Sequence, residues 1–155
     1  MNNLEEILKI IELLENRSII DIKINGINKP SLESVSLKSY LTYSRDLLEY
    51  VMVCIEANDT LDINSLMEQS RTNFVLIENT SVKDHYPIPH DQLSPLNIID
   101  KYCRSVCSII MFSNSLTAKD ILVGFTHSEG KIQIPFMELK IILEVSGAKI
   151  RQFTP

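Results

Sequence analysis

The feature that most constrains the fold is a long apolar stretch in the first half of the chain, LKSYLTYSRDLLEYVMVCI, at residues 37–55. Its apolar residues recur at intervals of three and four, which is the spacing of one face of a helix. From Leu47 to Ile55 the residues are apolar nearly all round, and a helix of that kind is buried on several sides. The stretch therefore predicts a buried central helix over about residues 36–57.

Length and composition predict a single globular domain over residues 1–155. A chain of 155 residues buries enough surface to fold without disulfides or metals. Glycine is scarce, with only four residues, which argues against a sandwich or barrel built from many tight turns. We expect an α+β fold that is mostly α, in which about five to six helices pack around the central helix.

Periodicity and helix-end signals predict the remaining elements. Ser94-Pro95 is a helix start, with serine as the cap and proline at the first helical position. Alternation of apolar and polar residues predicts a small two- or three-stranded sheet from residues 19–25, 131–134 and, as a third strand, 149–153. Residues 74–77 fit either a helix end or a short strand. The other predicted helices cover about residues 3–16, 62–77, 95–112, 117–124 and 136–146.

The sequence excludes several classes of protein. No segment is apolar over about 18 residues, so no membrane partner is expected. The first residues lack the basic region of a signal peptide. The three cysteines, Cys54, Cys103 and Cys107, stand in apolar surroundings, as reduced thiols of a cytoplasmic protein do. Neither a phosphate-binding glycine loop nor a serine–histidine–aspartate signature is present, so we expect no cofactor and no catalytic residue.

The negative charge is concentrated in the first half of the chain. Residues 1–70 hold twelve acids and six bases, a charge of −6, whereas residues 71–155 hold eight acids and nine bases, a charge of +1. Between Arg45 and Arg71 there is no basic residue. The acids in that interval are Asp46, Glu49, Glu56, Asp59, Asp62 and Glu68. Nucleic acid is therefore not an expected partner, because phosphate binding needs clustered lysine and arginine.

These six acids form the candidate partner-binding set. A local negative field speeds the capture of a basic protein and discriminates against acidic ones. Our preferred hypothesis is a non-enzymatic binding protein, of the immunity or antitoxin type, that neutralises a basic toxin or nuclease. A homodimeric scaffold is a third possibility, after the enzyme described below, because the predicted apolar helices have more than one apolar face.

The densest polar cluster, DHYPIPHD at residues 84–91, supports an alternative. Histidine titrates near neutral pH, and a neighbouring carboxylate can orient it, so His85, His90 and Asp91 could serve a small hydrolase or nuclease. Cys103 and Cys107 together with the two histidines give the ligand number of a zinc site. Because both cysteines lie in an apolar stripe, where free cysteine packs as a small hydrophobe, we predict no metal.

Overall fold

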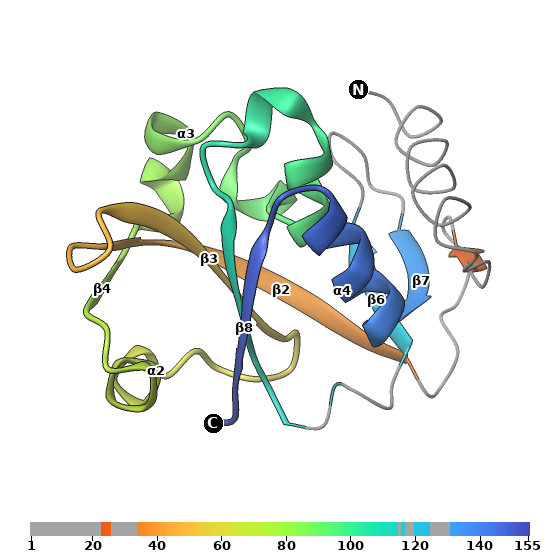
Figure 1. Cartoon of the computed structure of the whole chain (residues 1–155), viewed down its shortest axis with the longest axis horizontal. Helices are drawn as coiled ribbons and strands as arrows, with labels where there is room; N and C mark the ends of the chain where they lie inside the picture. The colour runs from red at the N-terminus through yellow and green to blue at the C-terminus, as the bar shows by residue number, and fades with distance from the viewer. Residues whose placement is uncertain (1–22, 26–33, 115, 117–119, 125–130) are drawn as a thin grey trace.

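The computed structural model describes residues 23–25, 34–114, 116, 120–124 and 131–155. Within these ranges the chain forms one mixed, curled sheet of eight strands with three helices and four 3₁₀ turns (Figure 1). The strands are β1 Lys23–Asn25, β2 Ser34–Ser44, β3 Glu49–Glu56, β4 Phe74–Leu76, β5 Ser108–Phe112, β6 Asp120–Gly124, β7 Lys131–Pro135 and β8 Lys149–Phe153. The helices and turns are α2 Ile63–Ser70, η1 Asn79–Ser81, α3 Val82–His85, η2 His90–Gln92, η3 Pro95–Ile99, η4 Lys101–Cys103 and α4 Phe136–Val145.

Seven of the strands follow one another across the sheet in the order β1-β7-β6-β2-β3-β5-β8, and β4 pairs with the far end of β2. The β2–β3, β2–β4, β6–β7 and β1–β7 pairs are antiparallel. The β2–β6, β3–β5 and β5–β8 pairs are parallel. The long strand β2 thus joins the two halves of the sheet, because β6 pairs with its start and β4 with its end.

The predicted central helix at residues 36–57 is wrong. The stretch folds back on itself as an antiparallel hairpin, with β2 and β3 in register from Leu37 opposite Glu56 to Ser44 opposite Glu49. The hairpin turn is Arg45–Leu48. Seven of the nineteen residues of the stretch are β-branched or aromatic, and such residues favour a pleated strand over a helix.

Strand β3 is apolar on both faces because both faces of the sheet are covered. Alternate residues of a strand point to opposite faces, and the core contacts of β3 divide in that way. One core holds Met52, Cys54, Ile109, Met111, Leu139 and Leu143 among others. The other holds Val51, Val53, Ile55, Ile110, Phe112 and Leu66. A strand buried on both faces has no apolar–polar alternation, so its sequence resembles a buried helix.

Helices cover the two faces of the sheet rather than forming the bulk of the fold. Helix α4 packs on one face through Phe136, Leu139 and Leu143, and Figure 1 shows it lying across the sheet near β6. Helix α2 packs on the opposite face through Leu66. The predicted mostly-α class is therefore wrong, and the molecule is an α/β protein organised on a large sheet. Among the described residues no helix is long and apolar enough to cross a membrane.

The predicted helix over residues 95–112 is confirmed only at its start. Ser94 accepts a hydrogen bond from the Leu96 amide (3.2 Å), and the Asn97 side chain accepts one from the Ser94 amide (2.8 Å), which together make a capping box. The segment then forms η3 and η4 and ends in strand β5. Asp100 causes the second break, because its carboxylate accepts from the Tyr102 amide and restarts the turn.

Several smaller predictions are confirmed. Residues 131–135 and 149–153 are strands, as predicted. Helix α2 is capped by Asp62, and Gly147, with a φ of 103°, follows the end of α4. The ambiguous residues 74–76 form a strand. Strand β8 pairs with β5 instead of the two predicted partners, and residues 120–124 form a strand rather than a helix. The predicted helix at residues 3–16 and most of the predicted strand at 19–25 lie outside the described residues.

Candidate functional site

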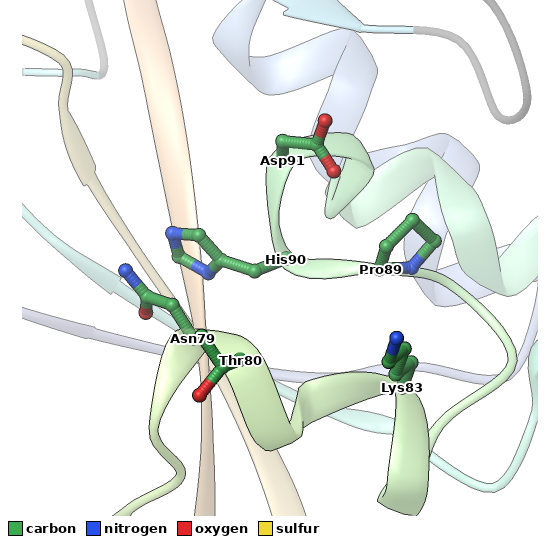
Figure 2. A pocket seen from close by; sticks show the side chains of 6 residues that line it. All are labelled: Asn79, Thr80, Lys83, Pro89, His90 and Asp91. Carbon is green, nitrogen blue, oxygen red and sulfur yellow. The ribbon is translucent and has the colours of Figure 1, made fainter.

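A surface cleft of about 330 Å³ lies where η1 and α3 face the loop that carries η2 (Figure 2). Six residues line it, namely Asn79, Thr80, Lys83, Pro89, His90 and Asp91. They come from one short segment of the chain, which leaves strand β4, forms two turns and then passes through two prolines. The cleft is therefore built from one local segment, and buried side chains of that segment hold it against the sheet.

Buried side chains fix both walls of the cleft. Val82 and Ile88 are fully buried, and Leu93 is nearly so, which anchors the segment between and after the lining residues. Tyr86 is also buried, and its hydroxyl donates to the Cys103 carbonyl at 2.9 Å. Pro87 and Pro89 restrict the backbone between these anchors. The cleft is consequently held in place by core packing, although its surface consists of loops.

The surroundings of His90 in the cleft shift the pKa of its imidazole. Its ring packs against the Tyr40 ring on β2, with 5.5 Å between the ring centres. Its Nδ1 atom is buried and has no hydrogen-bond partner. Burial lowers the pKa of His90, and the negative charge of Asp91 opposes this shift. The imidazole is therefore neutral at physiological pH and able to accept a proton.

The structure brings two of the three predicted loop residues to the cleft. His90 and Asp91 line it, but Figure 2 shows the Asp91 carboxylate pointing away from the imidazole ring. His85 does not line it. Its Nδ1 atom lies 2.8 Å from the Tyr50 hydroxyl, on the other side of α3. Asp91 therefore acts on His90 only through its charge, and the three residues form no catalytic triad.

Three cleft residues, Asn79, Thr80 and Lys83, were missed by sequence reasoning. They precede the polar cluster at residues 84–91, inside a segment whose two prolines already marked it as irregular. Nothing in their spacing shows that η1 and α3 bring them to the same cleft as His90. Amide, hydroxyl and ammonium groups can donate hydrogen bonds to an oxyanion, while a neutral imidazole can accept a proton from water. This set of groups suits hydrolysis of an ester.

The six acids of the candidate partner-binding set do not share one surface. Asp46 and Glu49 lie at the turn end of the β2–β3 hairpin, where Asp46 accepts from the Asn73 amide and Glu49 from the Ser108 hydroxyl. Glu56 lies at the opposite end of β3, roughly 23 Å away for seven residues of extended strand. Partner binding by these residues stays a prediction, but a single continuous acidic face is not available to them.

The other acids of that set lie on or near α2. Asp59 and Asp62 line a second cleft, of about 220 Å³, together with Thr60 and Asn114. The Asp62 carboxylate accepts from the Ser65 amide at 3.0 Å, so it serves as a helix cap. Glu68 is exposed on α2. Local structure thus accounts for part of the acidity of this segment.

The cysteines give no support to a metal centre. Cys103 is buried in the core, and Cys107 is exposed, with its thiol donating to the Arg104 carbonyl at 2.8 Å. Within the part of the chain that the structure describes, no group of three or more histidine, cysteine or acidic side chains is placed to hold a metal ion.

Comparison with known proteins identifies the fold. No protein-family model and no curated protein matches the chain. A candidate trans-editing enzyme for prolyl tRNA synthetase matches with a TM-score of 0.62 and 10% identity over 98% of this chain and 97% of that one. The hypothetical protein APE2540 matches with a TM-score of 0.62 and 15% identity over 92% and 96%. A candidate signal transduction protein from Marinobacter aquaeolei VT8 matches with a TM-score of 0.58 and 11% identity over 94% of this chain and 30% of its own.

These likenesses extend over nearly the whole chain, so the fold is one shared with a candidate editing enzyme. The predicted immunity or antitoxin-type inhibitor is wrong. It was inferred from the six acids and from the lack of a catalytic motif, whereas the fold is shared with a candidate editing enzyme, and in the described residues the acids lie at opposite ends of β3. The findings agree better with the alternative hypothesis, a small hydrolase that uses the loop at residues 84–91.

Proposed function

We propose that the chain is a hydrolase that cleaves the ester bond of a wrongly charged aminoacyl-tRNA. The observation that carries the proposal is the neutral imidazole of His90, held at the wall of a 330 Å³ cleft. The shared fold of the candidate trans-editing enzyme supports the choice of substrate class. Editing enzymes remove wrong amino acids by hydrolysis when binding alone cannot discriminate between them.

The cleft residues have separate roles in this reaction. His90 accepts a proton from a water molecule while the water oxygen attacks the ester carbonyl. Asn79 and Lys83 donate hydrogen bonds to the oxyanion that develops on the carbonyl oxygen. The bond to the ribose oxygen then breaks, and that oxygen takes the proton back from His90. The products are the free amino acid and uncharged tRNA.

The proposal departs from the expectation, drawn from net charge, that nucleic acid is not a partner. That expectation concerns binding along a phosphate backbone, which needs many basic residues. A deacylase of this kind has to bind only the charged end of the RNA. We also propose a cytoplasmic location, where aminoacyl-tRNA occurs and where the three free cysteines stay reduced.

The test is deacylation of a panel of tRNAs, each charged with either its correct amino acid or a wrong one. We expect the chain to release the amino acid from at least one mischarged tRNA. His90→Gln should lower that rate by roughly 100-fold or more, as expected for loss of a general base. Tyr102→Phe is the control and should retain the rate, because the exposed Tyr102 does not line the cleft. The absence of hydrolysis across the whole panel would overturn the proposal.

A further inference from the structure

A second cluster of side chains lies next to the cleft and takes no part in the proposed chemistry. Val75 on β4, Tyr43 on β2 and Tyr50 on β3 stand directly opposite one another across three strands, so they share one face of the sheet. His85 of α3 continues this row, with its ring centre 5.7 Å from that of Tyr50. We call Tyr43, Tyr50 and His85, together with the flanking Val75, the aromatic row.

The aromatic row is open to solvent. His85 is exposed, Val75 is 43% exposed, and the two tyrosines are half-buried. The tyrosine rings meet edge to face, with centres 5.1 Å apart and planes at 67°. Cross-strand packing alone would explain these two rings. It does not explain His85, whose ring is held against Tyr50 by a side-chain contact of 2.8 Å from a different element.

Helix α3 places the row beside the cleft. Lys83 and His85 are two positions apart on this single-turn helix, so they project to different sides of it. Lys83 lines the cleft, whereas His85 joins the row. A helix with its side chains is about 10 Å across, so the cleft and the row are separated by roughly that distance. Figure 1 shows α3 beside the turn end of the β2–β3 hairpin.

We propose that the aromatic row binds the terminal adenosine of an RNA 3′ end by stacking with its base. The inference rests on the proposed function, because that adenosine carries the amino acid in aminoacyl-tRNA. Exposed aromatic side chains are the usual stacking platform for unpaired bases. A nucleotide lying across α3 would place its acyl group in the cleft and its base on the row.

Charge around the row predicts the character of the binding. Lys83 and Asp84 on α3 carry opposite charges, and the hairpin beside the two tyrosines carries Arg45, Asp46 and Glu49. These charges nearly offset one another, so stacking rather than phosphate pairing should supply most of the affinity. Binding of a mononucleotide should therefore change little between low and moderate salt, in contrast to backbone-directed RNA binding.

The experiment is titration of the full chain with adenosine 5′-monophosphate, monitored by amide chemical shifts in NMR spectra and by calorimetry. We expect shifts at residues 43, 50, 75 and 85. Tyr50→Ala should weaken binding about tenfold or more, and Tyr50→Phe should keep it within about threefold, because the stacking ring remains. Tyr102→Ala removes an exposed tyrosine outside the row and should bind as the wild type does.

Equal affinity for ribose 5-phosphate would overturn the inference, because the base would then contribute nothing. So would shifts confined to other surfaces, or Tyr50→Ala binding as tightly as the wild type. The chemical-shift map of the wild type keeps the test decisive if a variant fails to fold. Deacylation without binding on the row would refute this inference alone. Binding on the row without any deacylation would refute the proposed function while leaving the stacking site in place.

Discussion

His90 shows how a single side chain can be set for chemistry by its position. The Tyr40 ring and the cleft wall shield it from water, and its Nδ1 atom is left buried without a hydrogen bond. An unpaired buried polar atom costs free energy, roughly 1 to 3 kcal/mol in typical cases. Protonation would add a buried charge to that cost, so the residue stays neutral.

The pH dependence of hydrolysis should follow this environment. Burial lowers the pKa of His90, so kcat/KM should rise with pH and reach half its maximum below the ordinary histidine value. Asp91→Asn removes the charge that raises this pKa and should move the midpoint to still lower pH. Asp84→Asn, outside the cleft lining, should leave the midpoint unchanged. A midpoint above the ordinary value would contradict the assignment of His90 as the base.

Asp62 has a local structural role that can be measured separately from any partner binding. Its carboxylate accepts the Ser65 amide hydrogen bond at the start of α2. Asp62→Ala should lower the free energy of unfolding by about 1 kcal/mol, and Asp62→Asn should lower it much less, because asparagine also caps well. Urea unfolding of both variants tests this. Asp59→Ala is the control, and an equal loss there would argue against capping.

At the level of elements, the β2–β3 hairpin marks the limit of prediction from sequence. Its turn contains neither glycine nor proline, and Leu48 takes a φ of 54° while 77% exposed. Ser44 and Asp46 are turn-forming residues, but without glycine, asparagine or proline beside them they gave only a weak turn signal. Without a strong turn signal the two strands were predicted as one helix, and the burial of β3 on both faces removed the alternation that marks a strand.

The same turn stores strain that a substitution should release. A left-handed backbone costs a residue with a Cβ atom roughly 1 to 2 kcal/mol, and glycine avoids that cost at some expense in chain entropy. Leu48→Gly should therefore raise the free energy of unfolding by up to about 1 kcal/mol, measured by thermal or urea unfolding. Leu47→Gly is the matched control, since Leu47 has no positive φ. If both variants are equally destabilised, the turn is not strained.

Elements with strong end signals were predictable, and so was part of the site. Ser94-Pro95 was predicted to start a helix, and Ser94 does cap η3. The loop at residues 84–91 was also identified, because its histidines, acids and prolines stand close together in sequence. Lys83 and the Tyr40–His90 contact were not, since they depend on how η1, α3 and β2 meet in space.

At the scale of the whole molecule, one sheet separates two cores. Leu139 of α4 is fully buried in the core on one face, and Leu66 of α2 is fully buried in the core on the other. Adjacent residues of β3 contribute to both, so neither core can come apart without loosening the other. This arrangement could not be read from the sequence, because periodicity gives no information on which helix covers which face.

The shared sheet predicts cooperative unfolding. Leu66→Ala and Leu139→Ala should each lower the free energy of unfolding by about 2 to 5 kcal/mol, as typical of buried leucine. Both variants should still unfold in a single transition when urea unfolding is monitored by circular dichroism. Met137→Ala, at a position 46% exposed on α4, should change stability by less than about 0.5 kcal/mol. Two separate transitions in either core variant would show that the faces unfold independently.

The parallel pairing of β8 with β5, and of β5 with β3, has a consequence for synthesis of the chain. Strand β8 pairs with β5, 41 residues earlier (108 to 149), and β5 pairs with β3, 57 residues earlier (51 to 108), and such non-local pairings form slowly. Until residues 149–153 have been made, β5 has an open edge next to an apolar core. Nascent chains should therefore depend on chaperone protection until residue 153 has left the exit tunnel.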